Sequence, residues 1–313
     1  MHVTRDATKS NPSAPRSLRT RISRLGRRIP LLKPFVRRTS IEWLKLLVEF
    51  RWLFHSQRKA QDHGLPTDLI VSLTSYPDRF PTLHKTLKCL LMQNVRPTAV
   101  VLWIAHEDAP TLPESVRALT ARGLTIRLTE NLRSYKKIIP ALAAFPDAII
   151  VTADDDVYYP PGWLKGFVEE YNPSENQILC YRGHLIRSEG GKILPYDLWD
   201  KAVTLDTASY DIFFTGVGGV LYPPHILHRD AADINLIHTL CPTTDDVWLN
   251  WMARLNGAMI RKVGCIGRFY EWPGSQTTAL MHVNVGDNAE NDRQIANVVS
   301  KYGTAHITIE HSA

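Results

Sequence analysis

Three consecutive carboxylates, Asp154, Asp155 and Asp156, form a run that could hold a metal ion. Adjacent carboxylates repel one another, so at least one is pushed towards protonation unless a cation or hydrogen-bond donors compensate. A divalent cation that also contacts phosphate is a natural compensation, because hard oxygen ligands suit Mg²⁺ or Mn²⁺. The alternative is a solvated acidic loop that caps the following helix. The apolar run that precedes the acids favours the metal site.

The flanking residues indicate where these acids lie in the fold. Ala148 to Val151 is a short apolar, β-branched run that predicts a buried strand. Pro160 and Pro161 stop the strand and can start a helix. The acids therefore follow the carboxyl end of a strand, which is where open α/β sheets bind their ligands.

A second acid pair, Asp245 and Asp246, opens a predicted helix. Its buried face is indicated by the helical spacing of Trp248, Trp251, Met252 and Leu255. Thr243 and Asp246 stand three residues apart, as in a capping box. The other interpretation is that one Asp serves as a general base. The local pattern taken alone favours the cap.

Between these two acidic motifs lies a glycine-rich turn that contains Gly216, Gly218 and Gly219. Such glycines allow a close approach of the backbone to a ligand, or simply permit turns with positive φ. The turn lacks the Gly-Lys-Ser/Thr ending and the following helix of a phosphate-binding loop.

The chain from Asp68 onwards alternates between strand and helix patterns. Strands are predicted at 69–74, 100–104, 124–128, 148–153 and 178–182, and helices at 81–93, 113–122 and 134–145. Strands that alternate with helices predict an α/β fold with a mostly parallel sheet and right-handed crossovers. We expect residues 66–303 to form this domain, followed by a C-terminal tail at 304–313.

Composition limits the other classes of function. A hydrophobic content of 44% and a charged content of 22% are typical of a soluble globular protein. The sequence contains no apolar run of about 18 residues, so no transmembrane helix is predicted. No secretory signal is recognised either. Four scattered cysteines argue against a disulfide framework and a zinc site, and fit a reducing cytoplasm.

The positive net charge of the chain comes from its N-terminus. Residues 1–38 carry eleven Lys or Arg and one acid, a net charge of +10, so the +6 of the whole chain leaves −4 for the remainder. The basic tail, 1–40, is predicted to be disordered, and nucleic-acid binding is not expected. Residues 41–65 form an amphipathic helical segment, which either anchors the protein peripherally on the anionic inner face of the cytoplasmic membrane or packs on the domain. An organellar transit peptide is a third alternative.

Taken together, these motifs resemble those of GT-A glycosyltransferases of the broad family-2 type found in bacterial surface-polysaccharide synthesis. The match comprises the turn within 70–79, the helix end at 87–93, Asp154–Asp156 as the Asp-x-Asp motif, the turn at 215–219, and Thr244–Asp246. The pair of acids that usually ends the family's second strand is shifted here, where the sequence reads Ala105-His106-Glu107-Asp108. The processive-synthase motif Gln-x-x-Arg-Trp is absent, which argues against a polymerase.

The resemblance implies a Rossmann-like GT-A fold and a metal-dependent, inverting transfer of sugar from a nucleoside-diphosphate sugar to a glycan or lipid-linked acceptor. The base would be Asp246, the second acid of its pair with Asp245, and the cofactor Mn²⁺ or Mg²⁺. Metal contacts are expected from Asp154 and Asp156, with His282 either a third ligand or a structural histidine. Contacts to the donor are expected from Thr74, Tyr76, Arg79, Asp154, Asp155, Gly218 and Gly219. Lys136 or Lys137 either binds the diphosphate or is solvated, and Asn284 could close over the nucleotide with His282.

Two other functions remain as alternatives. A magnesium-dependent phosphohydrolase of the haloacid-dehalogenase type also uses an Asp-x-Asp behind a strand, but its nucleophile normally ends the first core strand. A non-catalytic, membrane-tethered protein that binds nucleotide sugars would keep the fold without turnover.

Overall fold

The computed structural model describes residues 33–55, 60–204, 207–264, 269–273 and 290–310, with side chains from residue 41 onwards. The chain divides into two compact units, Met1–Leu47 and Val48–Ala313. Most of the predicted tail at 1–40 lies outside the described residues. Within the described part of the chain, no helix has both the length and the apolar character needed to cross a membrane.

The larger unit is built on a seven-stranded sheet with the order β14-β8-β13-β6-β2-β4-β5. The strands are β2 (Leu69–Thr74), β4 (Ala99–Ala105), β5 (Leu124–Thr129), β6 (Ile149–Thr152), β8 (Gln177–Cys180), β13 (Val220–Tyr222) and β14 (Met259–Lys262). Only β13 runs antiparallel to its neighbours in this sheet, so the predicted α/β fold with a mostly parallel sheet is confirmed. β2 and β6 are buried along almost their whole length, which explains their continuous apolar sequence.

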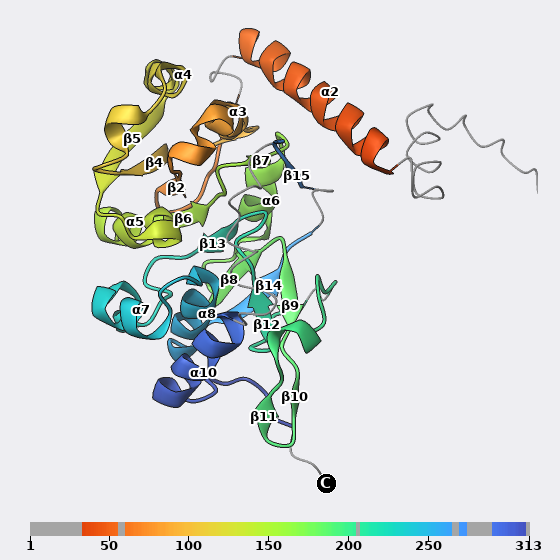
Figure 1. Ribbon diagram of the computed structural model, residues 1–313, viewed down its shortest axis with the longest axis vertical. Coiled ribbons are helices and arrows are strands. Elements are labelled where there is room, and N and C mark those ends of the chain that lie inside the picture. Colours follow the sequence, from red (N-terminus) through yellow and green to blue (C-terminus); the bar gives the residue numbers. More distant parts are fainter. Residues whose placement is uncertain (1–32, 56–59, 205–206, 265–268, 274–289, 311–313) are drawn as a thin grey trace, which may run out of the picture. The chain divides into compact units, whose positions relative to one another are not determined.

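Helices flank this sheet (Figure 1). They are α3 (Phe80–Leu91), α4 (Glu114–Arg117), α5 (Ile139–Ala144), α6 (Trp163–Glu170), α7 (Ile234–Leu240), α8 (Asp245–Leu255) and α10 (Glu290–Tyr302). α10 packs against both α7 and α8 (Figure 1). Short strand pairs complete the unit: β1 (Gln61–Asp62) with β3 (Val95–Arg96), β7 (Val157–Tyr158) with β15 (Tyr270–Glu271), β9 (Gly183–Leu185) with β12 (Ile212–Phe214), and β10 (Ser188–Glu189) with β11 (Lys192–Ile193).

Several predicted elements differ from the structure. The helical segment expected at 41–65 is α2 (Lys33–Leu53), which begins within the tail expected to be disordered at 1–40. The helix expected at 113–122 is the short α4 followed by a 3₁₀ helix at Ala118–Arg122. The helix expected at 134–145 is a 3₁₀ helix at Arg133–Lys137 followed by the short α5. Pro140 lies in the first turn of α5, and proline lacks the N–H that a continuous helix would need there. The strand expected at 178–182 ends at Cys180, and the chain then starts β9 at Gly183.

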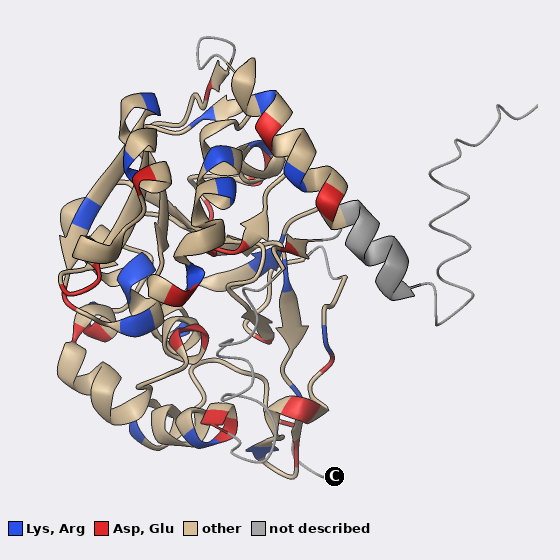
Figure 2. Ribbon diagram, turned by 45° about the horizontal axis from the view of Figure 1, so that its top comes forward, with Lys and Arg blue, Asp and Glu red and all other residues tan. Residues whose placement is uncertain are grey.

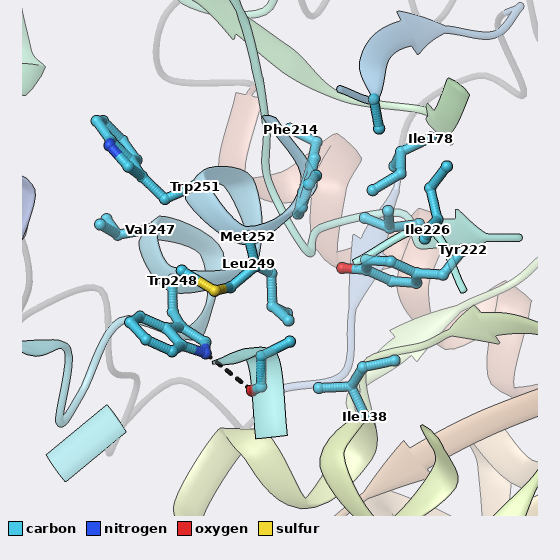
Figure 3. Packing of buried hydrophobic residues seen from close by; sticks show 14 of the residues in the cluster. Ile138, Ile178, Phe214, Tyr222, Ile226, Val247, Trp248, Leu249, Trp251 and Met252 are labelled. Atoms are coloured by element: carbon cyan, nitrogen blue, oxygen red, sulfur yellow. Dashed lines mark hydrogen bonds between the residues drawn. The ribbon is translucent and has the colours of Figure 1, made fainter. Parts of the chain in front are cut away.

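A hydrophobic core packs around α8 (Figure 3). Trp248, Trp251 and Met252 on this helix are fully buried in the same cluster as Phe214 and Tyr222. The indole N–H of Trp248 also donates to the carbonyl of Ala231 at 2.9 Å, so this large side chain buries no unpaired polar atom. Truncation of a buried tryptophan to alanine typically destabilises a fold by about 3–5 kcal/mol. The N-terminal turn of α8, which carries the acid pair, is therefore held in a fixed position.

Acidic and basic residues are interspersed over the described elements (Figure 2).

The helix α2 (Lys33–Leu53) crosses the division between the two units. From Val48 on, it belongs to the larger unit: Val48 is buried, and the Trp52 ring lies under the Arg122 guanidinium at 4.4 Å. The part of the predicted amphipathic helix from Val48 onwards therefore packs on the larger unit.

Candidate active site

The sheet order creates a crevice at the carboxyl ends of β2 and β6. β4 and β5 continue the sheet on one side of β2, whereas β6 lies on its other side, so the connections that leave β2 and β6 diverge. The register pairs Ser72 with Thr152, so both strands end at nearly the same level. A crevice at such a switch in strand order is where open α/β sheets bind ligands. Asp154–Asp156 follows β6 and Ser75–Arg79 follows β2 directly at this point.

Arg79 and Ser75 bridge this crevice. The Arg79 Nη1 atom lies 3.3 Å from Asp155 Oδ1 and is also paired with an oxygen of Asp156. Ser75 Oγ donates to Asp155 Oδ2 at 2.5 Å. Burial raises the pKa of Asp155 to about 6, although Arg79 and the Ser75 hydroxyl act in the opposite direction. Asp155 is thus held by the protein's own donors.

Asp154 has a different environment. Its backbone N–H donates to the Tyr159 hydroxyl at 2.8 Å, and its Oδ1 lies 3.8 Å from Lys137 Nζ. Burial, with the charges of Asp156 and Asp246, raises the pKa of Asp154 to about 7 against the effect of Lys137. The carboxylate therefore has too little positive charge around it, and a bound cation would supply the missing compensation.

Lys137 joins the two acidic motifs. Its Nζ lies 2.9 Å from Asp245 Oδ2, and Asp245 is 91 positions after Asp154 in the chain. Burial alone lowers the pKa of the Lys137 ammonium, but the carboxylates of Asp245, Asp154 and Asp246 outweigh it and raise the pKa above its usual value. The ammonium is buried and charged, so the interpretation of Lys137 as a solvated lysine is wrong. Lys136 is also buried, and its Nζ lies 3.8 Å from Asp108 Oδ2.

The Asp246 carboxylate does not cap α8. The N-cap residue is Thr244, whose side chain makes no capping hydrogen bond and instead donates to Gln294 Oε1 at 2.8 Å. Both oxygens of Asp246 accept from the Gly216 N–H, at 3.0 and 3.1 Å. The capping box predicted from Thr243 and Asp246 is therefore wrong, because the partner of Asp246 comes from a distant segment. Burial and the neighbouring Asp245 charge raise the pKa of Asp246 to about 6.

Asn250 sets the position of Gly216 relative to Asp246. The Asn250 side chain accepts from the Phe214 N–H at 3.1 Å and donates to the Phe214 carbonyl at 2.9 Å. Asn250 lies one turn after Asp246 on α8, and Gly216 lies two residues after Phe214. A Cβ on Gly216 would lie 3.0 Å from Lys137 Nζ, 3.3 Å from Asp246 Oδ1 and 3.8 Å from Asp154 Oδ1. The two acidic motifs and the lysine therefore converge on one point beside this glycine.

A cavity of about 770 Å³ opens over this point. The predicted site residues that line it are Thr74, Tyr76, Arg79, Lys136, Lys137, Asp154, Asp155, Asp156, Asp245 and Asp246. Thr74 Oγ1 donates to the Trp103 carbonyl at 2.8 Å, and the Tyr76 hydroxyl accepts from Arg79 Nε at 3.2 Å. This volume is in the range of pockets that hold ligands of a few hundred daltons.

Gly218 and Gly219 lie behind the cavity wall and are not among the lining residues, whereas Gly216 and Val217 are. Both have positive φ, +92° and +99°, which only glycine adopts readily. A Cβ on Gly219 would lie 2.8 Å from the Trp163 ring and 2.9 Å from the Thr152 carbonyl. Their requirement for glycine thus follows from the turn and from close packing.

The carboxylate oxygens at this site fit a divalent cation that is also bound by a phosphate of the ligand. Among the described residues, no three His, Cys, Asp or Glu side chains are grouped as a metal site. Mg²⁺ is, however, commonly held by one or two carboxylates together with substrate phosphates. Asp154, with its raised pKa, and the adjacent Asp156 supply such carboxylates. His282 and Asn284 lie outside the described residues.

Several residues that shape the site were not identified from the sequence. Ser75 and Asn250 act through hydrogen bonds to distant segments, and Arg182 lines the cavity from the loop after β8. The position of Ser75 directly after an apolar strand was an available signal. Neither Asn250 in mid-helix nor Arg182 carries a local signal that distinguishes it from a surface polar residue.

Comparison with known proteins gives similarity to solved structures only. No family model matches the sequence, and no curated protein matches it. Glucosyl-3-phosphoglycerate synthase from Mycobacterium tuberculosis, solved with Mn²⁺, UDP and phosphoglyceric acid, has a TM-score of 0.43 at 12% identity and covers 79% of this chain and 81% of its own. The mannosyltransferase from Pyrobaculum calidifontis, solved with GDP-Man and Mn²⁺, has a TM-score of 0.37 at 14% identity and covers 86% of each chain. The inositol-1-phosphate CTP transferase from T. maritima has a TM-score of 0.39 at 13% identity and covers 77% of this chain and 97% of its own. At these identities and scores, the similarity does not by itself establish a family or an activity for this chain.

Proposed function

We propose that this chain is a metal-dependent, inverting glycosyltransferase. It would transfer a sugar from a nucleoside-diphosphate sugar to a hydroxyl of a glycan or lipid-linked acceptor in cell-surface polysaccharide synthesis. The observation that carries the proposal is the convergence of Asp154 and Asp246 on the cavity beside Gly216, with Lys137 between them. A site for this reaction needs two features close together, namely a place for a diphosphate and a base for a hydroxyl.

Asp246 is the proposed general base. Its carboxylate is oriented by the Gly216 N–H, faces the cavity, and has a pKa raised to about 6 by burial and Asp245. A base with a pKa near the working pH accepts a proton more readily than an ordinary aspartate does. An acceptor hydroxyl deprotonated by Asp246 would attack the anomeric carbon from the face opposite the leaving diphosphate. A single displacement of this kind inverts the anomeric configuration.

The other side of the site is proposed to bind the donor. Arg79, Asp155 and Ser75 form a buried network that would hold the nucleotide part, with Thr74 and Tyr76 on the same wall. The Lys137 ammonium lies between Asp154 and Asp245, where it can stabilise negative charge on a diphosphate. Mn²⁺ or Mg²⁺ bound at Asp154 and Asp156 would neutralise the leaving diphosphate.

A panel of nucleoside-diphosphate sugars tests this proposal. The full-length protein with Mn²⁺ should release nucleoside diphosphate from at least one sugar nucleotide, and the sugar should appear on an acceptor with inverted configuration by NMR. Release of inorganic phosphate from phosphomonoesters with no reaction of sugar nucleotides would instead support the phosphohydrolase. That alternative is disfavoured because β2, the first strand of the central sheet, ends without an acid and Asp245–Asp246 opens a helix. Binding of a sugar nucleotide without turnover under any condition would support the non-catalytic alternative.

We also propose that α2 attaches the protein peripherally to an anionic membrane surface. Trp43, Leu46, Phe50 and Leu53 are spaced three or four residues apart, so they share one helical face. Within the larger unit, Phe50 and Leu53 are 62% and 77% exposed. The basic residues at 1–38 precede this stripe in the sequence and add the charge that attracts anionic lipid.

A further inference from the structure

The basic side chains that line the cavity form two groups. Those near the acidic motifs are paired with carboxylates, whereas those of a second wall are not. Arg79 is paired with Asp155 and Asp156, Lys136 with Asp108, and Lys137 with Asp154 and Asp245. Arg182 and Lys201 also line the cavity, and both come from the segment between β8 and β12. Neither has a carboxylate within ion-pairing distance among the residues that the structure describes.

The sheet order separates these two groups of cations. Arg79 follows β2 and Lys137 precedes α5, on the β2–β4–β5 side of the triple acid. Arg182 follows β8, which is separated from β6 by β13. The proposed donor residues therefore lie on one side of Asp154–Asp156, and Arg182 lies on the other.

Arg182 is also close to the proposed base. The Thr215 N–H donates to the Arg182 carbonyl at 3.1 Å, and the next residue, Gly216, donates to Asp246. The Arg182 charge is near enough to lower the pKa of Asp246, although burial outweighs this effect. Thr215 Oγ1 is buried in the same wall with no hydrogen-bond partner among the described residues. An unpaired buried hydroxyl in a cavity is a position where a ligand can form a hydrogen bond.

Tyr196 and Lys201 complete this wall. The Tyr196 backbone N–H donates to Asp292 Oδ1 at 2.6 Å, and its ring packs against Trp199 with 5.0 Å between centroids. Lys201 Nζ lies 3.5 Å from the centre of the Tyr196 ring and donates to the Tyr196 carbonyl. Asp197 lies near enough to favour the Lys201 charge, but burial and Arg182 together leave the Lys201 pKa below its usual value. A fixed aromatic ring with an adjacent ammonium is a suitable platform for an anionic sugar or polyol.

His184 lies beside these two cations and also lines the cavity. His184 Nδ1 accepts from the Ala202 N–H at 2.9 Å, so the neutral ring carries its proton on Nε2. Burial, with the charges of Arg182 and Lys201, lowers the pKa of His184 to about 4. The ring is therefore neutral at physiological pH, and the positive charge of this wall comes from Arg182 and Lys201.

From this geometry we infer that Arg182 and Lys201, with the Tyr196 ring, bind an anionic group of the acceptor, a phosphate or a carboxylate that lies near the accepting hydroxyl. This inference rests on the proposed function, because it assigns the wall on the Asp246 side to the acceptor. Arg182 would form charge-assisted hydrogen bonds to the anion, and Thr215 Oγ1 would bond a hydroxyl of the same molecule. The acceptor class is thereby narrowed to molecules that carry a negative charge.

Three small probes test the inference: glycerol 3-phosphate, glycerate and neutral glycerol. Each is titrated by calorimetry into the full chain already saturated with Mn²⁺ and a nucleoside diphosphate, so that the diphosphate position is occupied. We expect the better of the two anions to bind at least about tenfold more tightly than glycerol, since a hydrogen bond to a charged group is worth about 1.5–3 kcal/mol. The comparison between glycerol 3-phosphate and glycerate shows which anion the wall prefers.

Matched variants locate the effect. Arg182→Gln and Lys201→Gln should each weaken anion binding by about tenfold or more and leave nucleotide affinity unchanged. Arg187→Gln is the control, because Arg187 is a nearby exposed cation that is paired with Asp200 and does not line the cavity. It should bind the probes as the wild type does.

The outcomes separate the inference from the proposed function. Equal binding of all three probes, or an anion preference that survives in Arg182→Gln, would overturn the inference while nucleotide binding keeps the proposed function intact. Loss of nucleotide affinity in Arg182→Gln, with unchanged anion binding, would assign Arg182 to the donor and also overturn it. Failure of the wild type to bind any nucleoside diphosphate with Mn²⁺ would refute the proposed function, and the inference with it.

Discussion

Gly216→Ala is expected to impair the reaction without unfolding the protein. The φ of Gly216 is compatible with alanine, so the backbone is not strained. The new Cβ would lie 3.0 Å from Lys137 Nζ and 3.3 Å from Asp246 Oδ1, both closer than ordinary contact. The lysine end is flexible and can move by a few tenths of an ångström. The ammonium and the base would therefore both be displaced within a folded site.

The expected loss follows from the hydrogen bond between Gly216 and Asp246. A hydrogen bond to a charged group is worth about 1.5–3 kcal/mol, which corresponds to about 10–150-fold in rate if the bond is lost in the transition state. Steady-state kcat/KM for sugar transfer measures this loss, and thermal melting measures stability. We expect kcat/KM to fall within this range and the melting temperature to stay within a few degrees of the wild type.

Two other glycines serve as controls. Gly219→Ala should destabilise the fold by at least about 1–2 kcal/mol, because its φ is positive and its Cβ would meet the Thr152 carbonyl at 2.9 Å. Gly264→Ala should change neither rate nor stability, since among the described residues other than its two chain neighbours no atom lies within 4 Å of its Cβ position. Wild-type kcat/KM in Gly216→Ala would refute the geometry of the site.

Three further predictions concern pH, metal and membrane. Burial and the Asp245 charge raise the pKa of Asp246 to about 6. With donor and metal saturating, kcat should therefore fall as the pH decreases through about 6, because protonation of Asp246 removes the base. A flat profile of kcat between pH 5 and 8 would contradict this prediction. Excess chelator should abolish transfer and added Mn²⁺ should restore it, because neighbouring acids at Asp154 and Asp156 cannot hold a diphosphate unaided, and full activity in chelator would rule out metal dependence. The double variant Leu46→Ser, Phe50→Ser should sediment less with anionic vesicles than the wild type does. Vesicle binding of the wild type should weaken as salt rises, because exposed charges are screened. The control is Leu198→Ser, which changes another exposed leucine, and equal vesicle binding by the double variant and this control would contradict the membrane anchor.

The sequence predicted the elements whose signal is local. The strand predicted at 69–74 matches β2 residue for residue, and the strand predicted at 148–153 contains β6. Both could be predicted because a strand that is buried on both faces has a continuous apolar sequence. The start of α8 near Asp245 was also correct, since the tryptophans that bury it recur at helical spacing. The helix expected at 134–145 does not form as one element, because Pro140 lacks the N–H that a continuous helix needs at that position.

The arrangement of the site depends on contacts that have no local pattern. A capping box at Thr243 was plausible from spacing alone, but the Asp246 carboxylate is held by the Gly216 N–H, 30 residues away. The sequence likewise could not show that Gly216 faces the cavity while Gly219 packs behind it, because that distinction depends on Trp163. The charge state of Lys137 follows from three carboxylates that only the fold brings together.

The most direct test of the proposed chemistry is the single-turnover rate of sugar transfer by Asp246→Asn at saturating donor, with Asp245→Asn as the matched variant. The change removes a base and keeps the shape of the side chain. The account predicts a folded Asp246→Asn protein with donor affinity close to the wild type and a chemical step slower by about 10²–10⁴-fold. Asp245→Asn should retain more of the rate, because Asp245 is engaged by Lys137 rather than by the acceptor. A folded Asp246→Asn protein that transfers sugar at close to the wild-type rate would contradict the account and move the base to another residue.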